Sequence, residues 1–274
     1  MNTLIVASLV VLTNGFGTVR VDTLGAHVLS YVPAGGREVL FRQSGERRAD
    51  QWFNAGIPVC WPWFGRYGDP GSCMHGFARL FEWEVVSHED TPRESTLRLR
   101  LKSDERSARY FDGAFELNCE IVLSDALKME LKMRNTGEKR FAVTTGFHPY
   151  FRVRELTAAT VRTPRGEIRC VPGMDGGRLF ADGRYVLDDG EREITLTTWG
   201  NNKLVVWNQG EKPLGGLAPE DWRRFVCVEP AILPRMEGIW LEPQATYEIG
   251  MSIRAEMRDR SGGAAVRSQG GAGR

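Results

Sequence analysis

Three consecutive stretches alternate strictly between apolar and polar residues: Leu97-Arg-Leu-Arg-Leu-Lys102, Phe115-Glu-Leu-Asn-Cys-Glu-Ile121 and Leu127-Lys-Met-Glu-Leu-Lys-Met-Arg134. Successive side chains of a β-strand point to opposite faces, so this period of two predicts strands with one buried face and one solvated face. Only the short connection Ser124-Asp125 separates the second stretch from the third. Because parallel strands need crossovers of about a dozen residues, we expect an antiparallel meander.

The same reasoning extends to the rest of the chain. Long amphipathic helices are missing from the pattern, and only 103–110, with Ser103 as its cap, and 219–224, with a proline at its start, are expected to form short helices. Many strands without long helices predict an all-β protein, a large antiparallel β-sandwich. Further strands are predicted at 18–23, 27–32, 82–87, 141–146, 193–198, 203–207, 225–229 and 247–255.

Composition predicts a single folded domain followed by a tail. The chain has 274 residues, of which 42% are hydrophobic, and its formal net charge is +1. No overall field therefore favours nucleic acid or an anionic membrane. We expect residues 1–256 to form one domain. Residues 257–274 contain four arginines, one aspartate and five glycines, so we expect a disordered tail.

The cysteines and the N-terminal segment indicate the compartment. The five cysteines form no C-x-x-C pair, which is typical of reduced, mostly buried thiols in a cytoplasmic protein. The apolar run 4–12 is too short to span a bilayer and follows no positive charge, so we expect a buried first strand rather than a signal peptide. A cytoplasmic monomer without a membrane or nucleic-acid partner is the expectation.

Histidines are scarce, which narrows the possible chemistry. The chain has only His27, His75, His88 and His148, and it lacks H-E-x-x-H, P-loop, G-x-S-x-G and G-x-G-x-x-G motifs. His27 belongs to an alternating stretch, and His88 lies among acidic residues at a strand end. Both are predicted to be structural or solvated.

Three segments depart from the alternating pattern. Residues 55–66 and 74–79 include two prolines and three large aromatic residues within eight positions, and they are either the wall of a cavity or an irregular part of the core. His148 precedes Pro149, which favours an extended conformation; it is either functional or a satisfied buried histidine. Glu229 ends an apolar run, where a carboxylate needs a partner. It is either a general base or half of a structural ion pair.

Taken together, these segments resemble the aldose 1-epimerase family, and most of all its hexose-6-phosphate mutarotase (glucose-6-phosphate 1-epimerase) branch. The resemblance covers about residues 18–255, with the motifs in the family's order, and implies the large antiparallel β-supersandwich of the galactose mutarotase-like fold. The motifs are Gly-Ile-Pro-Val-Cys-Trp-Pro-Trp-Phe-Gly (56–65), His-Gly-Phe-Ala-Arg (75–79), His-Pro-Tyr-Phe-Arg (148–152), Val-Val-Trp-Asn (205–208) and Val-Cys-Val-Glu-Pro (226–230).

The resemblance implies an isomerase that interconverts α and β anomers by opening and reclosing the sugar ring. This chemistry needs one acid and one base, without a metal or a cofactor. By the family pattern His148 is the acid that serves the ring oxygen, Glu229 is the base at the anomeric hydroxyl, and His75 supports them by hydrogen bonding.

The family pattern also implies the substrate contacts. Arg79 and Arg66 are expected to hold a sugar phosphate, although Asn54 stands where the branch has a further arginine and brings no charge. Asp182 matches loosely as an aspartate that orients the substrate, with an exposed turn residue as the alternative. An apolar wall against the sugar is expected from Trp61, Trp63, Phe64 and Tyr150.

Other functions remain open from the sequence. The substrate could be an unphosphorylated aldose, or the protein could be a non-catalytic carbohydrate-binding module or sugar sensor on the same fold. His75, His148 and Glu229 also form a possible metal-ligand set. A retaining glycosidase comes last, since it needs a second carboxylate about 5 Å from Glu229.

Overall fold

The computed structural model describes residues 8–43, 53–67, 72–176, 181–233 and 238–258. In these ranges the chain forms strands, turns and four short 3₁₀ helices, η1 (Ala78–Leu80), η2 (Ser107–Arg109), η3 (Leu156–Ala158) and η4 (Asp221–Arg224), with no α-helix. The all-β prediction is therefore confirmed. The strands are β1 (Leu9–Asn14), β2 (Gly17–Asp22), β3 (His27–Pro33), β4 (Val59–Cys60), β5 (Glu84–Asp90), β6 (Ser95–Lys102), β7 (Phe115–Leu123), β8 (Leu127–Asn135), β9 (Phe141–Val143), β10 (Thr145–Phe147), β11 (Tyr150–Arg152), β12 (Thr160–Thr163), β13 (Gly166–Arg169), β14 (Asp175–Gly176), β15 (Gly183–Asp188), β16 (Arg192–Trp199), β17 (Lys203–Trp207), β18 (Phe225–Ile232), β19 (Ile239–Leu241) and β20 (Thr246–Met257).

The predicted meander forms half of a nine-stranded sheet with the order β13-β12-β15-β16-β20-β8-β7-β6-β5. Strands β5 to β8 are neighbours in both sequence and space, and every pair is antiparallel. Along β8 the apolar residues Leu127, Met129, Leu131 and Met133 are fully buried, whereas the polar residues between them are not. The period of two therefore predicted the buried face correctly.

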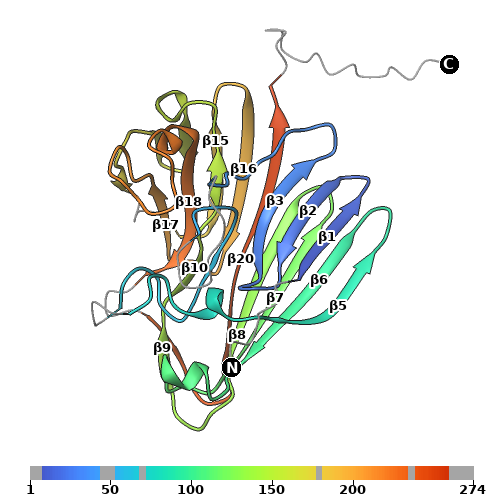
Figure 1. The fold of residues 1–274 in the computed structure, drawn as a ribbon, viewed down its shortest axis with the longest axis vertical. Coiled ribbons are helices and arrows are strands. Elements are labelled where there is room, and N and C mark those ends of the chain that lie inside the picture. The colour runs from blue at the N-terminus through green and yellow to red at the C-terminus, as the bar shows by residue number, and fades with distance from the viewer. Residues whose placement is uncertain (1–7, 44–52, 68–71, 177–180, 234–237, 259–274) are drawn as a thin grey trace, which may run out of the picture.

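Two smaller sheets pack on this large sheet and complete the sandwich. The three-stranded sheet β1-β2-β3 lies against the β5–β8 half, and a six-stranded sheet containing β17, β18 and β10 lies beside the β15–β16–β20 half (Figure 1). Apolar residues from all three sheets form one continuous core. Trp61 belongs to this core, where it contacts Phe77, Phe111 and Phe115. The expectation that Trp61 lines a sugar pocket is therefore wrong.

The six-stranded sheet contains a break that positions the site. On one side β18 pairs with β17 along Cys227 to Ala231. On its other side β18 pairs with β11 as far as Cys227 and with β10 only from Ala231 onward. Residues 148–149 join β10 to β11 opposite this interval. Pro230 was predicted to end the strand, but β18 continues to Ile232, because a missing N–H costs no ladder hydrogen bond in an unpaired interval.

Two local predictions need correction. The first described strand begins at Leu9 and is an edge strand, with Leu9 52% and Val11 38% exposed, so it is not buried; residues 4–7 lie outside the described residues. The helix expected over 103–110 shrinks to η2, and Asp104 rather than Ser103 accepts the first N–H groups, those of Arg106 and Ser107. Ser103 instead accepts the N–H of Phe115.

The C-terminal boundary lies later than predicted. Strand β20 includes Met257, and Arg258 pairs with Asp188 and Glu193 on the neighbouring strands. The tail therefore does not begin at 257; residues 259–274 lie outside the described residues. All five cysteines are free, and all except Cys73 are buried. Of the helices in the described part of the chain, none has the length and apolarity to cross a membrane.

The meander makes a stability prediction. Leu131→Ala, at a fully buried position of β8, should lower the free energy of unfolding by about 2–5 kcal/mol because it opens a cavity in the core. Lys132→Ala, at the next and exposed position, should change it by less than about 0.5 kcal/mol. Equilibrium urea denaturation measures both, and equal effects would contradict the assignment of faces.

Candidate active site

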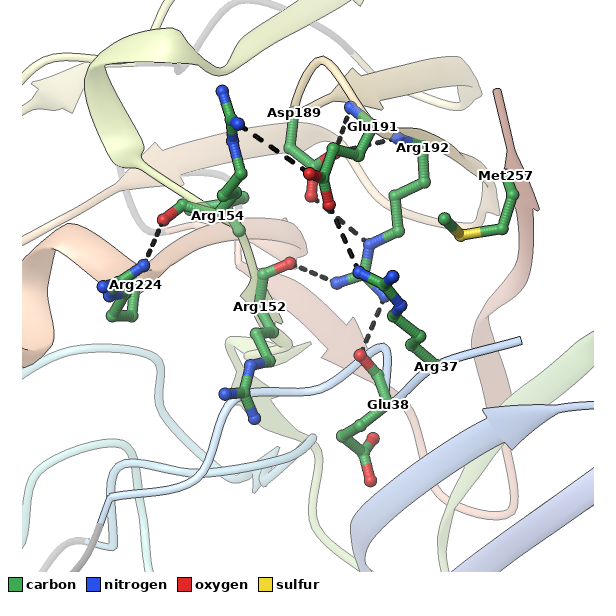
Figure 2. A pocket seen from close by; sticks show the side chains of 10 residues that line it. Arg37, Glu38, Arg152, Arg154, Asp189, Glu191, Arg192, Arg224 and Met257 are labelled. Carbon is green, nitrogen blue, oxygen red and sulfur yellow. Dashed lines mark hydrogen bonds and ion pairs between the residues drawn. The ribbon is translucent and has the colours of Figure 1, made fainter. Parts of the chain in front are cut away.

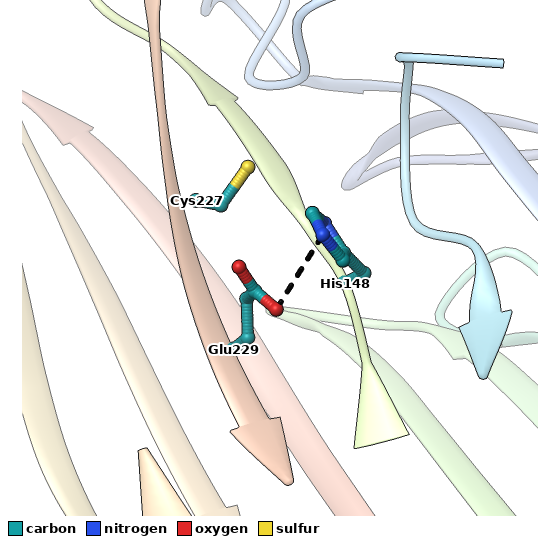
Figure 3. A group of neighbouring side chains, drawn as sticks. All are labelled: His148, Cys227 and Glu229. Carbon is teal, nitrogen blue, oxygen red and sulfur yellow. Dashed lines mark ion pairs between the residues drawn. The ribbon is translucent and has the colours of Figure 1, made fainter. Parts of the chain in front are cut away.

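His148 and Glu229 face one another across the break between β10 and β11 (Figure 3). His148 Nε2 lies 3.6 Å from Glu229 Oε2. Both residues are buried, with 4% and 1% of their surface exposed. The structure thus brings together the two residues that sequence analysis singled out, although 81 positions separate them in the chain.

Aromatic rings hold the imidazole of His148 in place. The Tyr150 ring stacks on it at a centroid distance of 4.8 Å, and the Phe64 ring lies nearly parallel to it at 6.2 Å. His75 and Trp207 approach with their rings nearly perpendicular, at 5.0 and 5.9 Å. This packing leaves the side chain of His148 little freedom to turn away from Glu229.

An unusual turn brings His75 to the site. His75 and Gly76 both have positive φ, 61° and 75°, and a Cβ on Gly76 would lie 2.0 Å from the carbonyl oxygen of Trp61. Only glycine fits there. The N–H of Gly65 donates to His75 Nδ1 at 3.1 Å, and the N–H of His75 donates to the Gly65 carbonyl at 2.8 Å. Since Nδ1 accepts, Nε2 carries the proton of the neutral ring.

Burial determines the protonation of the pair. It lowers the pKa of His148 to about 3, and it raises the pKa of Glu229 well above its ordinary value, with the charge of Asp175 adding to the shift. The pKa of His75 is lowered well below its ordinary value, first by burial and then by His148 and Arg79. Burial therefore favours the neutral forms of His148 and Glu229.

Asp175 is a residue of the site that sequence analysis missed. It lies on β14 beside Trp207, close enough for its charge to act on Glu229. Asp182, the predicted aspartate, is exposed, and its carboxylate accepts the N–H of Asn201. Among the contacts given for the described residues, those of Asp182 are with Asn201 and, through its charge, with Tyr185 and Tyr247. No local pattern distinguishes the two aspartates; only the pairing of β14 with β17 does.

Asn54 is buried and fully engaged in hydrogen bonds. Its Nδ2 donates to Gln43 Oε1 at 2.8 Å and to the Gly215 carbonyl at 2.9 Å, and its Oδ1 accepts the hydroxyl of Tyr150 at 3.2 Å. Asn54 was expected among the substrate-binding residues; in the structure its amide is engaged by neighbouring protein groups. Asn54 instead fixes the ring of Tyr150, which stacks on His148.

The two predicted arginines differ in placement. Arg79 is buried in η1, where its Nε donates to the Met74 carbonyl at 3.3 Å, and its charge acts on His75. Arg66 is exposed, and no contact joins it to the histidines in the described part of the chain.

The aromatic residues of the first motif differ in what they contact. Phe64 contacts both His75 and His148. Trp63 turns elsewhere: its Nε1 donates to the Cys73 carbonyl at 2.7 Å and its ring stacks on Tyr67. Of the four aromatic residues predicted to line the sugar, Phe64 and Tyr150 therefore border the imidazole of His148.

The possible metal ligands form a different set from the one weighed from sequence. Among the described residues the group is His148, Cys227 and Glu229, whose ligand atoms lie within 4.8 Å of one another (Figure 3). A metal binds the thiolate form of cysteine. Burial and the charge of Glu229 raise the pKa of the Cys227 thiol well above its ordinary value.

Comparison with known proteins identifies the family of the chain. A family model described as aldose 1-epimerase matches residues 8–170. A Salmonella typhimurium protein named "Putative glucose-6-phosphate 1-epimerase" is 28% identical over 230 residues, which cover 75% of this chain and 76% of that protein. An Escherichia coli protein of the same name is 27% identical over 259 residues, 85% of each chain.

Solved structures share the fold. One titled "putative mutarotase (YeaD)" from Salmonella typhimurium has a TM-score of 0.85 at 23% identity, covering 93% of this chain and 92% of that one. Galactose 1-epimerase from Lactobacillus acidophilus has a TM-score of 0.72 at 13% identity, covering 92% and 95%. The fold is that of the mutarotases, as predicted.

The chain belongs to the aldose 1-epimerase family, because the family model matches more than half of it. It is an epimerase that interconverts the anomers of a sugar. The rival prediction of a non-catalytic sugar-binding protein is thereby set aside.

The buried carboxyl makes a prediction about stability. A folded-state pKa above the unfolded value of 4.5 means that raising the pH above about 4.5 costs about 1.4 kcal/mol per pH unit until the folded pKa is reached. Glu229→Gln removes that cost, so its melting temperature should exceed that of the wild type at pH 8.

The difference in melting temperature should disappear below about pH 4.5, where the carboxyl is protonated in both states. The exposed Glu248→Gln is the matched control and should follow the wild type at every pH. Calorimetry measures all three proteins. A Glu229→Gln variant that is less stable at pH 8 would contradict the predicted shift.

Proposed function

We propose that this epimerase acts on a hexose 6-phosphate, with glucose 6-phosphate as its substrate, and that His148 and Glu229 perform the proton transfers. The observation that carries the proposal is the buried pair itself, an imidazole and a carboxyl 3.6 Å apart. A sugar ring that opens between them needs one group that donates a proton and one that accepts it.

The proposed reaction balances its protons within this pair. The reaction starts once the carboxyl proton of Glu229 has passed to His148. The Glu229 carboxylate then takes the proton of the anomeric hydroxyl, while the His148 imidazolium protonates the ring oxygen and the C1–O5 bond breaks. Glu229 is then protonated and His148 neutral, the state that burial favours in the empty site. The open aldehyde rotates, and the reverse transfers close the ring from its other face.

The neighbouring residues receive supporting roles. His75 holds a proton on Nε2 and can donate it to a sugar oxygen. Asp175 lies at the β14–β17 edge, where a carboxylate can accept sugar hydroxyls and also raises the proton affinity of Glu229. Phe64 and Tyr150 keep the imidazole of His148 oriented.

The phosphate assignment rests on Arg79 and Arg66 and on the names of the curated relatives. Arg79 lies beside His75, and a guanidinium binds phosphate through two parallel hydrogen bonds. Arg66 directly follows the motif at residues 56–65. Its side chain is exposed and can reach a bound sugar phosphate.

An unphosphorylated aldose is the second candidate. The observation that favours it is Asn54, a neutral and fully engaged residue where the mutarotase branch for sugar phosphates has an arginine. The two candidates share one mechanism and differ in the anion site.

Anomer equilibration followed by NMR tests the proposal. Freshly dissolved α-glucose 6-phosphate is compared with α-glucose and α-galactose. Saturable acceleration of the phosphate sugar alone would support the proposal, whereas acceleration of the free sugars alone would support the second candidate. No acceleration of any of the three would contradict both.

The acid–base roles make a prediction about turnover. His148→Ala and Glu229→Gln should each reduce kcat by about 10²–10⁴-fold, the usual contribution of a general acid or base. His27→Ala is the matched control, because His27 is buried on β3, where its Nε2 lies 2.8 Å from the Ala55 carbonyl oxygen, and it has no part in the proposed proton transfers. Wild-type turnover in either site variant would remove that residue from its role.

The phosphate site makes a separate prediction. Arg66→Gln and Arg79→Gln should raise KM for glucose 6-phosphate by about tenfold or more, the effect of losing a charge-assisted hydrogen bond. The same variants should change KM for unphosphorylated glucose little. An equal change for both sugars would show that these arginines do not select phosphate.

A further inference from the structure

A polar hollow lies near the start of β18, at Arg224, away from Glu229. Its volume is about 560 Å³, and its lining comes from the ends of β11 and β20, the start of β16, the segment before β18 and residues 37–38 (Figure 2). It shares no residue with the His148–Glu229 site. Five arginines line it: Arg37, Arg152, Arg154, Arg192 and Arg224.

We call this hollow, with its five arginines, the arginine cleft, and Arg192 forms its rigid floor. Only 7% of Arg192 is exposed. Its guanidinium donates to the Glu38 carbonyl at 2.8 Å and to the Arg152 carbonyl, and it pairs with Asp189 at 3.4 Å. These bonds hold the two backbone segments that carry Arg37 and Arg152. In the same way Arg224 donates to the Arg154 carbonyl.

The remaining charges do not balance. Glu38 directs its carboxylate to Ser30 and to the N–H groups of Tyr31 and Leu40, and Asp189 neutralises Arg192. Glu191 is then the single acidic lining residue left to face the exposed arginines.

Glu191 meets only two of those arginines, and weakly. It lies 3.3 Å from Arg37 and 3.8 Å from Arg154. Arg152 makes no side-chain hydrogen bond or ion pair within the described residues. In Figure 2 the guanidinium groups of Arg37, Arg152, Arg154 and Arg224 surround the hollow from different sides.

We propose that this cleft binds a small molecule that carries at least two linked phosphate groups. Five arginines against the carboxylates of Glu38, Asp189 and Glu191 leave an excess of two positive charges in the lining, and two phosphoryl groups carry roughly three to four negative charges near neutral pH. Guanidinium groups recognise phosphate oxygens in pairs. A volume of this size is typical of small-ligand sites, and it lies on a chain with a net charge of only +1.

Isothermal titration with inorganic pyrophosphate tests the proposal, with ADP and monophosphate as parallel ligands. The test variant is Arg37→Gln/Arg154→Gln, since both side chains are more than 60% exposed and can be changed without disturbing the core. Arg100→Gln is the matched control, because it removes the same charge on β6, where Arg100 pairs with Glu84. Arg79→Gln reports on the substrate site.

The expected result is one pyrophosphate site per chain that weakens about tenfold or more in the double variant. Arg100→Gln and Arg79→Gln should leave that affinity unchanged, and monophosphate should bind more weakly. Tight binding of ADP as well would mark a nucleotide as the source of the diphosphate; pyrophosphate binding without ADP binding would point to another diphosphate.

Three results would overturn the proposal. The first is that pyrophosphate does not bind to the wild type. The second is that pyrophosphate binding is lost in Arg79→Gln but not in the double variant. The third is that the affinity for pyrophosphate falls as much in Arg100→Gln as in the double variant. Binding of single-stranded RNA without binding of pyrophosphate would also overturn it, in favour of a macromolecular partner. Unchanged anomer equilibration by the double variant checks that its fold is intact.

Discussion

The burial of Glu229 beside His148 is the constraint on which the site depends. A carboxyl and an imidazole removed from water both favour their neutral forms, and here burial drives their pKa values in opposite directions. The two groups lie 3.6 Å apart, and in the proposed reaction a sugar that contacts both exchanges a proton with each. The cost of this burial is a loss of stability that rises with pH, a common feature of active sites.

The packed sheets offset that cost, and their strand pairing holds His148 and Glu229 opposite each other. β18 is buried along its entire length, and it remains a strand through Pro230 because β17 pairs with it on one side. The break between β10 and β11 supplies the opening into which His148 turns. The Asn54 amide and the Tyr150 ring then hold the imidazole of His148 in place.

Arginine has contrasting roles in the two polar regions of the molecule. Near the active site, Arg79 is buried and single, and it acts on His75. In the arginine cleft, Arg192 and Arg224 use their donors on backbone carbonyls, and the exposed arginines are left with one carboxylate. A pattern search by motif does not find this cleft, because its residues come from separate segments and no single segment is unusual.

The amino-acid sequence alone determined the fold class and the buried faces of β6 to β8, and it singled out His148, His75 and Glu229, which the structure brings together, because alternation and unusual local chemistry are properties of neighbouring residues. It did not determine which of two aspartates approaches Glu229, which aromatic residues border the imidazole, or that Asn54 is saturated with hydrogen bonds. Only the tertiary structure decided these, since each depends on pairing between strands far apart in the chain, as with Asp175 and Trp207. Protonation was also decided there, because a pKa follows burial, and burial exists only after the sheets have packed.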